Sequence, residues 1–402
     1  AYLVGGGVRD LLLGGHPKDF DIATNATPEQ VHNLFRNSRL IGRRFKIVHV
    51  VFGREIIEVT TFRGSAPVDP ETDNEDGHEG HAVGAHGQLL RDNIYGSKEE
   101  DALRRDFTVN ALYYCIRDFT VHDYANGLSD LQQRTLRLIG DPQVRYREDP
   151  VRMLRAVRFA AKLDFRIADD AGAPIPALAD LLHNVPPARL FEEVLKLLAA
   201  GHGLRTYELM TEYDLFGALF PASAEAIEDD DTGRFDRLIR AALENTDARV
   251  HEGKSVSPYF LYAALLWPAL EVARIHHESQ GESPYQALHM AANDVVDEQI
   301  QYTAVPRRFS VPMKEIWDLQ QRLPKRQGKR AELLLEHPRF RAGYDFLLLR
   351  EAAGENTGGL GTWWTRYQQA EGHVREDLLH DAPVPAGPRK RRRRKRKPAA
   401  RS

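Results

Sequence analysis

Cysteine and long apolar segments are both scarce in this sequence of 402 residues. The single cysteine, Cys115, has no second cysteine with which to form an internal disulfide. The longest apolar stretch, residues 259–270, has 12 residues and contains Pro268, whereas a membrane-spanning helix needs ~20. A charged N-terminal region followed by an apolar segment is also missing. We therefore expect a cytoplasmic protein with no membrane span, preceded by further residues because the chain opens without Met on a strand-like segment.

Acidic residues are absent from the last fifteen positions, 388–402, which carry ten Lys or Arg. The whole chain has 55 basic and 58 acidic residues, so the remainder without this segment has a net charge of −13. Nine consecutive cations at 389–397 repel one another and stay disordered unless a polyanion is present. We predict a disordered basic tail over 381–402 that binds nucleic acid, with a solubility tail or a surface-anchoring segment as alternatives.

The pattern of apolar residues changes once along the chain. Short β-rich runs at 2–5, 19–24, 45–52 and 55–62 alternate with helical patterns at 8–13 and 28–36. A last strand pair is predicted at 111–116 and 119–124. After residue 130 apolar residues recur at spacings of three and four, which predicts helices, and no fixed repeat is visible. The predicted domains are an α/β head over 1–130 with a mobile acidic loop at 64–88, a helical neck over 131–215, a helical body over 216–380, and the tail.

A glycine-rich turn opens the first predicted helix. The segment GGGVRD at 5–10 follows a strand, and glycines there let backbone amide groups approach a phosphate at the start of a helix. Because any tight strand-to-helix turn also needs glycine, this pattern alone does not separate phosphate binding from a simple turn.

Paired carboxylates follow in the segment KDFDIAT at 18–24. Asp19 and Asp21 are two residues apart, so on a strand they lie on the same face. Two like charges cost free energy unless a cation lies between them, and Mg²⁺ favours one or two carboxylates together with phosphate oxygens. A third carboxylate is either Glu58, opposite the apolar Ile57 and Val59 in strand alternation, or Asp106 in RRDFTVN at 104–110. A phosphate turn, two metal-bridging acids and a third acid together predict a two-metal site for nucleotidyl transfer.

Arginines recur every three residues in the segment EDPVRMLRAVRF at 148–159. Asp149 is suited to cap the helix and Pro150 to its first turn. Arg152, Arg155 and Arg158 form a stripe on one side, which is typical of a solvated face but also matches phosphates and base edges.

These segments together resemble one family, the class II nucleotidyltransferases of the polymerase β superfamily, which comprise bacterial poly(A) polymerases and CCA-adding enzymes. The motifs that carry the resemblance are LVGGGVRD at 3–10, KDFD at 18–21, RRDFTVN at 104–110, and ED at 148–149 with the three arginines. The resemblance implies a polymerase β-like α/β head followed by all-α neck and body domains. It also implies template-independent transfer of AMP from ATP to RNA 3′ ends, with two Mg²⁺ ions, or Mn²⁺ in their place. RNA-decay or RNA-chaperone proteins would be its protein partners.

The resemblance also implies residue roles. Asp19, Asp21 and Asp106 would be catalytic, with Asp106 ranked before Glu58 as the third acid on the metal side. Nucleotide-binding residues would be Gly5, Gly6, Arg9, Arg105, Asn110, Asp149, Arg152, Arg155 and Arg158, of which Asp149 and Arg152 would read the incoming base.

Two other functions fit parts of the sequence. A CCA-adding tRNA nucleotidyltransferase would share every catalytic motif, but it has no need of a cationic tail to hold one folded tRNA. A non-catalytic RNA-binding adaptor would be expected to have lost acidic positions, yet all four candidate acids are present.

Overall fold

The structure is a computed structural model, and it describes every residue except 18, 43–45, 65–81, 84–88, 92–93 and 381–402. The chain divides into two compact units. Unit 1 consists of Ala1–Ala224, Leu243–Val256 and Gln299–Ala304, and unit 2 consists of Glu225–Ala242, Ser257–Glu298 and Val305–Ser402. Unit 1 therefore contains both the predicted head and the predicted neck. The main division falls nine residues after the predicted boundary between neck and body.

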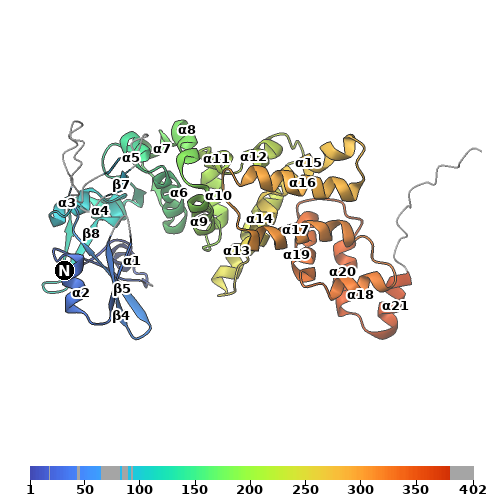
Figure 1. The fold of residues 1–402 in the computed structure, drawn as a ribbon, viewed down its shortest axis with the longest axis horizontal. Coiled ribbons are helices and arrows are strands. Elements are labelled where there is room, and N and C mark those ends of the chain that lie inside the picture. Colours follow the sequence, from blue (N-terminus) through green and yellow to red (C-terminus); the bar gives the residue numbers. More distant parts are fainter. Residues whose placement is uncertain (18, 43–45, 65–81, 84–88, 92–93, 381–402) are drawn as a thin grey trace, which may run out of the picture. The chain divides into compact units, whose positions relative to one another are not determined.

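A seven-stranded mixed sheet forms the first part of unit 1, which confirms the α/β head (Figure 1). The spatial order of its strands is β3-β4-β5-β2-β1-β8-β9, and β2 and β5 are the parallel neighbours. The strand β3 was not predicted. The strands are β1 (Tyr2–Val4), β2 (Asp21–Thr24), β3 (Ser38–Ile41), β4 (Ile47–Phe52), β5 (Glu55–Thr61), β8 (Leu112–Cys115) and β9 (Thr120–Asp123), and a separate pair is formed by β6 (Ala82–Val83) and β7 (Leu89–Arg91).

Short helices accompany this sheet, and local sequence explains where two of them begin. Thr27 and Gln30 form a reciprocal capping box before α2, and Ser97 and Glu100 do the same before α3. Each box satisfies two amide groups that the first turn of a helix leaves without partners. The helices are α1 (Gly6–Leu12), α2 (Pro28–Leu34), α3 (Lys98–Leu103), the 3-10 turn η1 (Thr108–Asn110) and α4 (Gly127–Gln132).

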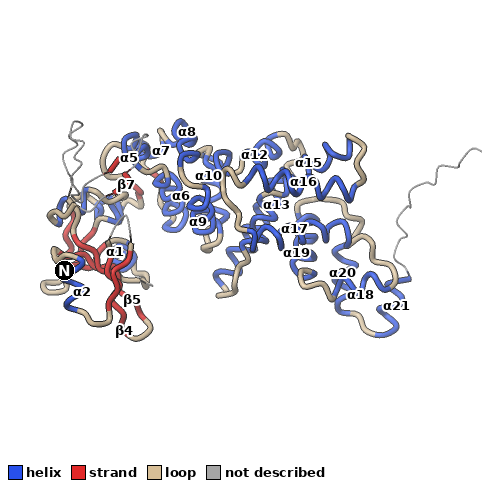
Figure 2. Tube along the Cα trace, viewed as in Figure 1, coloured by secondary structure: helices blue, strands red, loops and turns tan. Residues whose placement is uncertain are grey.

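The rest of unit 1 is mainly helical (Figure 2). Its elements are α5 (Pro142–Glu148), α6 (Val151–Leu163), α7 (Asp169–Gly172), α8 (Ile175–Leu178), η2 (Ala179–Asn184), α9 (Pro187–Leu198), α10 (Gly203–Glu212) and α11 (Leu215–Leu219), while α12 (Pro221–Glu228) crosses into unit 2. One detail differs from a purely helical neck. The two-residue strands β10 (Thr135–Leu136) and β11 (Arg166–Ile167) pair in parallel, which is too short a pattern to recognise in the sequence.

Unit 2 is built from helices. They include α14 (Pro258–Leu265), α15 (Trp267–Ser279), α17 (Arg307–Arg322), α18 (Lys329–Leu335), α19 (Phe340–Ala352), α20 (Leu360–Gln369) and α21 (Gly372–His380), while α13 (Arg234–His251) and α16 (Pro284–Gln299) are shared with unit 1. The long apolar stretch at 259–270 covers α14 and the start of α15, where Leu261, Leu265 and Leu270 are buried in the core. In the described part of the chain, no helix is long and apolar enough to cross a membrane.

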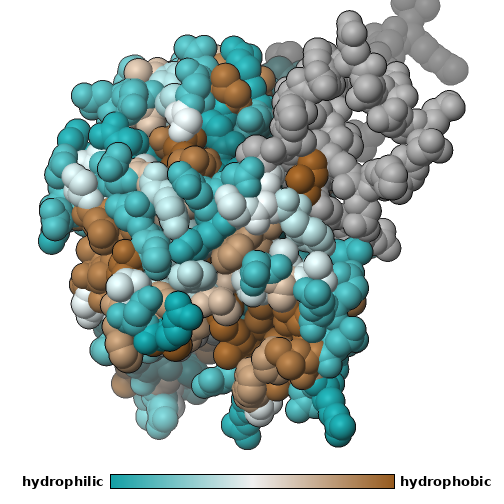
Figure 3. Space-filling view, turned by 90° about the vertical axis from the view of Figure 1, so that its left-hand side faces the viewer, coloured by the Kyte–Doolittle hydropathy of each residue, from teal (hydrophilic) through white to brown (hydrophobic). Residues whose placement is uncertain are grey.

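The surface of the head is largely polar with local apolar areas. Figure 3 shows brown apolar surface gathered in the lower part of the face that it presents. Leu34, Phe52 and Ile56 are among the large apolar side chains that the head exposes. Most of the predicted loop 64–88 and the whole predicted tail 381–402 lie outside the described residues.

Candidate active site

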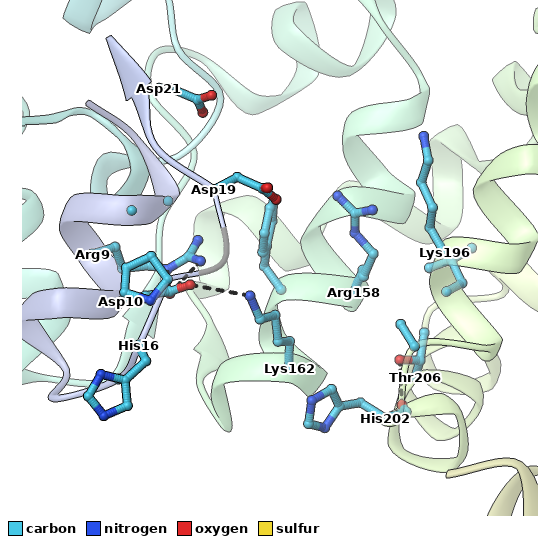
Figure 4. Close-up of a pocket in the computed structure, with 17 residues that line it drawn as sticks. Arg9, Asp10, His16, Asp19, Asp21, Arg158, Lys162, Lys196, His202 and Thr206 are labelled. Atoms are coloured by element: carbon cyan, nitrogen blue, oxygen red, sulfur yellow. Dashed lines mark hydrogen bonds and ion pairs between the residues drawn. The ribbon is translucent and has the colours of Figure 1, made fainter. Parts of the chain in front are cut away.

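A pocket of about 740 Å³ lies within unit 1, between the strand-to-helix turn of the head and the helices α6, α9 and α10 (Figure 4). Gly6, Gly7, Asp19 and Asp21 line it from the head. Arg158, Lys162, Lys196, His202 and Thr206 are among the residues that line it from the helices. The carboxylates of the pocket therefore come from the head, where Arg9 also lines it, and the helices contribute further cations.

The carboxylates of Asp21 and Glu58 are brought together by strand pairing. Asp21 in β2 is the register partner of Glu58 in the parallel strand β5, so both side chains leave the same face of the sheet. Asp19 lies just before β2 rather than in it, which corrects the expectation that both aspartates lie on one strand. It nevertheless lines the same pocket as Asp21 (Figure 4). The neighbour of Glu58 on its other side is His49, whose Nε2 atom is 3.2 Å from the Glu58 carboxylate.

The electrostatics of Asp21 indicate a place for a cation. Burial raises the pKa of the Asp21 carboxyl, and the nearby Glu58 and Asp19 charges raise it further, against the opposing effect of Arg105. Within the described residues, no three His, Cys, Asp or Glu side chains already converge tightly enough to enclose a metal ion. Mg²⁺ does not need such a cage, because it binds to one or two carboxylates and completes its shell with waters and substrate phosphates. The carboxylates of Asp19, Asp21 and Glu58 therefore fit a divalent cation of that kind.

Asp106 is placed differently from these acids. Its carboxylate is 2.6 Å from Arg155 in α6, and it also accepts hydrogen bonds from the Asn110 amide at 3.3 Å and the Phe107 backbone N–H at 2.8 Å. Although burial acts to raise it, these contacts hold the pKa of the Asp106 carboxyl below its usual value. The charge of Asp106 is thus already neutralised by protein.

Arg9 is buried and fully engaged. Its side chain is 2% exposed. It donates to the Asn110 side-chain oxygen at 2.5 Å and lies 2.6 Å from the Asp10 carboxylate. Because Asn110 also bonds to Asp106, a continuous chain of polar contacts runs from Arg9 through Asn110 and Asp106 to Arg155.

One aromatic ring supports three guanidinium groups in this region. The ring of Phe159 lies 5.2 Å from the guanidinium carbon of Arg9, 5.1 Å from that of Arg155 and 5.0 Å from that of Arg158. Cation–π attraction orients guanidinium groups over an aromatic face. The arginine stripe of α6 is therefore a partly buried, ordered surface rather than a freely solvated one.

The guanidinium group of Arg105 lies next to Gly5 in the glycine turn. It donates to the Tyr113 hydroxyl at 3.0 Å and to Asp101 at 3.4 Å. Gly5 has a φ of 74°, and a Cβ atom built there would lie 3.2 Å from the Arg105 guanidinium and 4.0 Å from the Asp21 carboxylate. Glycine is required at this position by both backbone conformation and space.

The two residues expected to read the base lie where α5 meets α6. The helix α6 begins at Val151 with Pro150 as its cap, one residue later than predicted, while the Asp149 carboxylate still accepts a 3.4 Å hydrogen bond from the Val151 N–H. Asp149 is 3.1 Å from Arg189 of α9. Arg152 is 2.8 Å from Glu148. Neither Asp149 nor Arg152 lines the pocket described above.

The sequence reasoning did not identify several residues of this site. Lys162, Lys196, His202 and Thr206 line the pocket, and Asp10 joins it through Arg9 and Lys162. Burial lowers the pKa of the His202 imidazole, and His251 and Lys162 lower it further, against the effect of Asp247. Lys162 continues the face of α6 beyond the arginine stripe, which was a usable signal, whereas nothing in the sequence brings α9 and α10 to the same pocket.

Comparison with known families covers most of the chain. Residues 1–137 match the "Poly A polymerase head domain", residues 164–227 match the "Probable RNA and SrmB- binding site of polymerase A", and residues 280–398 match the "Polymerase A arginine-rich C-terminus". The three matched segments follow one another along the chain, and all three descriptions name a poly(A) polymerase or polymerase A.

Individual relatives extend over nearly the whole chain. Poly(A) polymerase I of Salmonella typhi is 52% identical over 100% of this chain and 86% of that protein. Poly(A) polymerase I of Haemophilus influenzae is 48% identical over 95% of this chain and 84% of that protein. A solved structure of the Bacillus stearothermophilus CCA-adding enzyme in complex with CTP has a TM-score of 0.55 and 25% identity, and it covers 94% of this chain and 77% of that one.

Proposed function

Because the chain belongs to the bacterial poly(A) polymerase I family, it is a polynucleotide adenylyltransferase, and we propose that Asp19, Asp21 and Glu58 hold the divalent cations of its active site. The activity is the addition of AMP units to RNA as a poly(A) tail. The observation that carries it is the identity of about half of all residues with enzymes of this name over the full chain. In sequence, the CCA-adding enzyme of Lactobacillus helveticus is 36% identical over 54% of this chain, against 52% identity over the whole chain for poly(A) polymerase I of Salmonella typhi.

The pairing of β2 with β5 supports Glu58 as the third acid in place of Asp106. Glu58 and Asp21 are register partners on one sheet face, and the Glu58 charge raises the pKa of Asp21. Asp106 is instead 2.6 Å from Arg155. We assign Asp106 to positioning Arg155, and through Asn110 also Arg9. Two Mg²⁺ ions, with Mn²⁺ as a substitute, would polarise the phosphoryl oxygens and stabilise the attacking and leaving oxygens.

The protein groups themselves orient the nucleotide. Gly5 and Gly6 leave room for the phosphates next to Asp21. Asp149 and Arg152 offer an acceptor and a donor pair at the start of α6, where they would read the edge of adenine in place of a template strand. Arg105, Arg155 and Arg158 set the positive field around the phosphates without carrying out a chemical step.

RNA 3′ ends are the second substrate, consistent with the RNA-binding segment matched at 164–227. We also propose that this segment contacts an RNA-handling protein, because the matching family description names SrmB beside RNA. Chromatography of the full chain mixed with SrmB of the same bacterium would test this, and separate elution of the two would contradict it. We place the enzyme in the cytoplasm, together with ATP and its RNA substrates, which cell fractionation would check.

Nucleotide choice tests the function directly. The purified chain, an unstructured RNA and Mg²⁺ are incubated with ATP alone, with CTP alone, or with both. A long tail with ATP alone is expected. Addition that stops after a few nucleotides and needs CTP would indicate CCA addition, and no incorporation in any mixture would indicate an RNA-binding adaptor.

A further inference from the structure

Three cations border the pocket on its helical side, and two of them, Lys162 and Lys196, have no role so far in phosphate binding. Arg158 and Lys162 come from α6, and Lys196 comes from α9; in Figure 4 they border the pocket across from Asp19 and Asp21. Lys162 and Lys196 are 46% and 52% exposed, so both amines can reach into solvent.

Two other cations near the reaction centre are already held by protein groups. Arg9 lines the pocket, but it is 2% exposed and held by Asn110 and Asp10. Arg155 is 2.6 Å from the buried Asp106 carboxylate, and taking it away would leave that charge without compensation. A triphosphate carries several negative charges and needs cations that can move to it at little cost.

Lys162 and Lys196 meet that requirement. The Lys162 amine is 3.4 Å from Asp10, whose carboxylate keeps Arg9 at 2.6 Å if Lys162 turns away. The Lys196 amine is 2.8 Å from Glu193 three residues earlier on the same helix, and ion pairs of such exposed lysines contribute little to stability. Arg158 has no carboxylate within ion-pair distance among the described residues, and it rests on the ring of Phe159.

We propose that Lys162 and Lys196, together with Arg158, hold the β- and γ-phosphates of ATP and stabilise pyrophosphate as it leaves, an assignment that rests on the proposed adenylyl transfer. In that step the RNA 3′-oxygen forms a bond to the α-phosphorus. The bond from that phosphorus to the bridging oxygen breaks, pyrophosphate leaves with the electron pair, and the hydroxyl proton passes to solvent. Negative charge grows on the leaving oxygens, where fixed cations are most effective.

The phosphate of ATP fits this place better than a phosphate of the RNA chain. Arg152, at the end of α6 proposed to read the base, and Lys162 are ten residues apart, which is ~15 Å along a helix. One nucleotide lying along this face would place its base at Arg152, its α-phosphate near Asp21 and its outer phosphates at Lys162.

Nucleotide binding without RNA tests the assignment. The full-length variants Lys162→Gln and Lys196→Gln are compared with the unaltered enzyme for their affinity for ATP, AMP and pyrophosphate in Mg²⁺. AMP has the same base, sugar and α-phosphate but lacks the outer phosphates. We expect each variant to bind ATP and pyrophosphate about tenfold more weakly, with AMP affinity and the KM for RNA unchanged.

A matched control is available on α10. Arg205 is 57% exposed and pairs with Glu208 three residues later, as Lys196 pairs with Glu193, but Arg205 does not line the pocket. Arg205→Gln is expected to change none of the affinities. A variant that loses AMP and ATP affinity equally, that loses neither, or that raises only the KM for RNA overturns the assignment, the last result pointing to an RNA phosphate. Failure of the unaltered enzyme to incorporate AMP would instead contradict the proposed function.

Discussion

Two acidic regions of unit 1 differ in what surrounds their carboxylates. At Asp21, burial and the acidic neighbours Glu58 and Asp19 raise the pKa against the effect of Arg105. At Asp106 the neighbours are Arg155, Asn110 and a backbone amide, and the pKa of Asp106 is lowered. Like charges that nearby protein cations offset only in part indicate a place for an external cation, whereas a neutralised carboxylate indicates a positioning role. The comparison therefore separates a metal-binding role for Asp21 from a positioning role for Asp106 within one site.

The largest expected effect is on catalysis at the first region. Asp21→Asn should lower the rate of AMP incorporation by at least about a thousandfold, because loss of a metal ligand removes several kcal/mol of transition-state stabilisation. Single-turnover incorporation of ATP measures this, with circular dichroism to verify the fold. Asp164→Asn is a suitable control, since Asp164 is 91% exposed and does not line the pocket. Near-normal activity of Asp21→Asn would remove the distinction between the two regions.

At the second region, around Asp106, substitution should lower the stability of the folded protein. Asp106→Asn leaves Arg155 without its carboxylate partner, so the free energy of unfolding should fall by about 2 kcal/mol. Denaturation by urea measures it. In the double variant Asp106→Asn/Arg155→Gln the loss should be smaller than the sum of the two single losses, because the two groups interact directly. A catalytic loss as large as that of Asp21→Asn, with unchanged stability, would place Asp106 at the metals after all.

The third expected effect is on the choice between nucleotides, which we assign to Arg152. Arg152 shares Glu148 with Arg145, so part of its donor capacity can turn to a base. Arg152→Ala should reduce discrimination between ATP and CTP by about 1–3 kcal/mol. The ratio of kcat/KM for the two nucleotides measures this, and Arg147→Ala, at an exposed neighbour, is the control. If both nucleotides weaken equally, Arg152 is a general phosphate contact.

The smallest effect is on stability at Asp21 itself. Its pKa is raised in the folded state, so the folded protein binds the proton more tightly than the unfolded chain does. This contribution is complete below the unfolded pKa of 3.8 and is lost as the pH rises through the folded pKa. Without divalent cations, Asp21→Asn should therefore be more stable than the unaltered enzyme at neutral pH, by about 0.2–1 kcal/mol for a like-charge strand pair. Thermal unfolding in EDTA at pH 7 measures the difference, and a less stable variant would contradict the repulsion.

Local sequence predicted the elements of the head well, because its strands and caps are short-range patterns. The strand β3 was missed because its apolar Leu40 and Ile41 are both exposed, so no buried alternation marks it. Motif spacing located Asp19 and Asp21 but left Glu58 and Asp106 undecided, since the decision depends on which strand lies beside β2. The register of Asp21 with Glu58 depends on tertiary structure, and no local sequence pattern indicates it.

The sequence also gave no indication of which helical residues line the pocket. Lys196 and His202 belong to α9 and to the cap of α10, which reach the pocket only through packing against α6. Lone cations on amphipathic helices have the same pattern whether they face solvent or substrate. Periodicity therefore predicted the helices but not which of their charged residues line the site.

The parallel pairing of β2 and β5 also determines when the site can arise during folding. Asp21 and Glu58 are 37 positions apart, and the segment that joins them contains β3 and β4, which lie beyond β5 in the sheet. Closing a non-local parallel pair is slow compared with forming a hairpin such as β4 with β5. Glu58 must also have left the ribosome before it can pair. A growing chain that displays the glycine turn and both aspartates therefore still lacks the complete acidic group, and transfer activity begins only after this part of the sheet has closed.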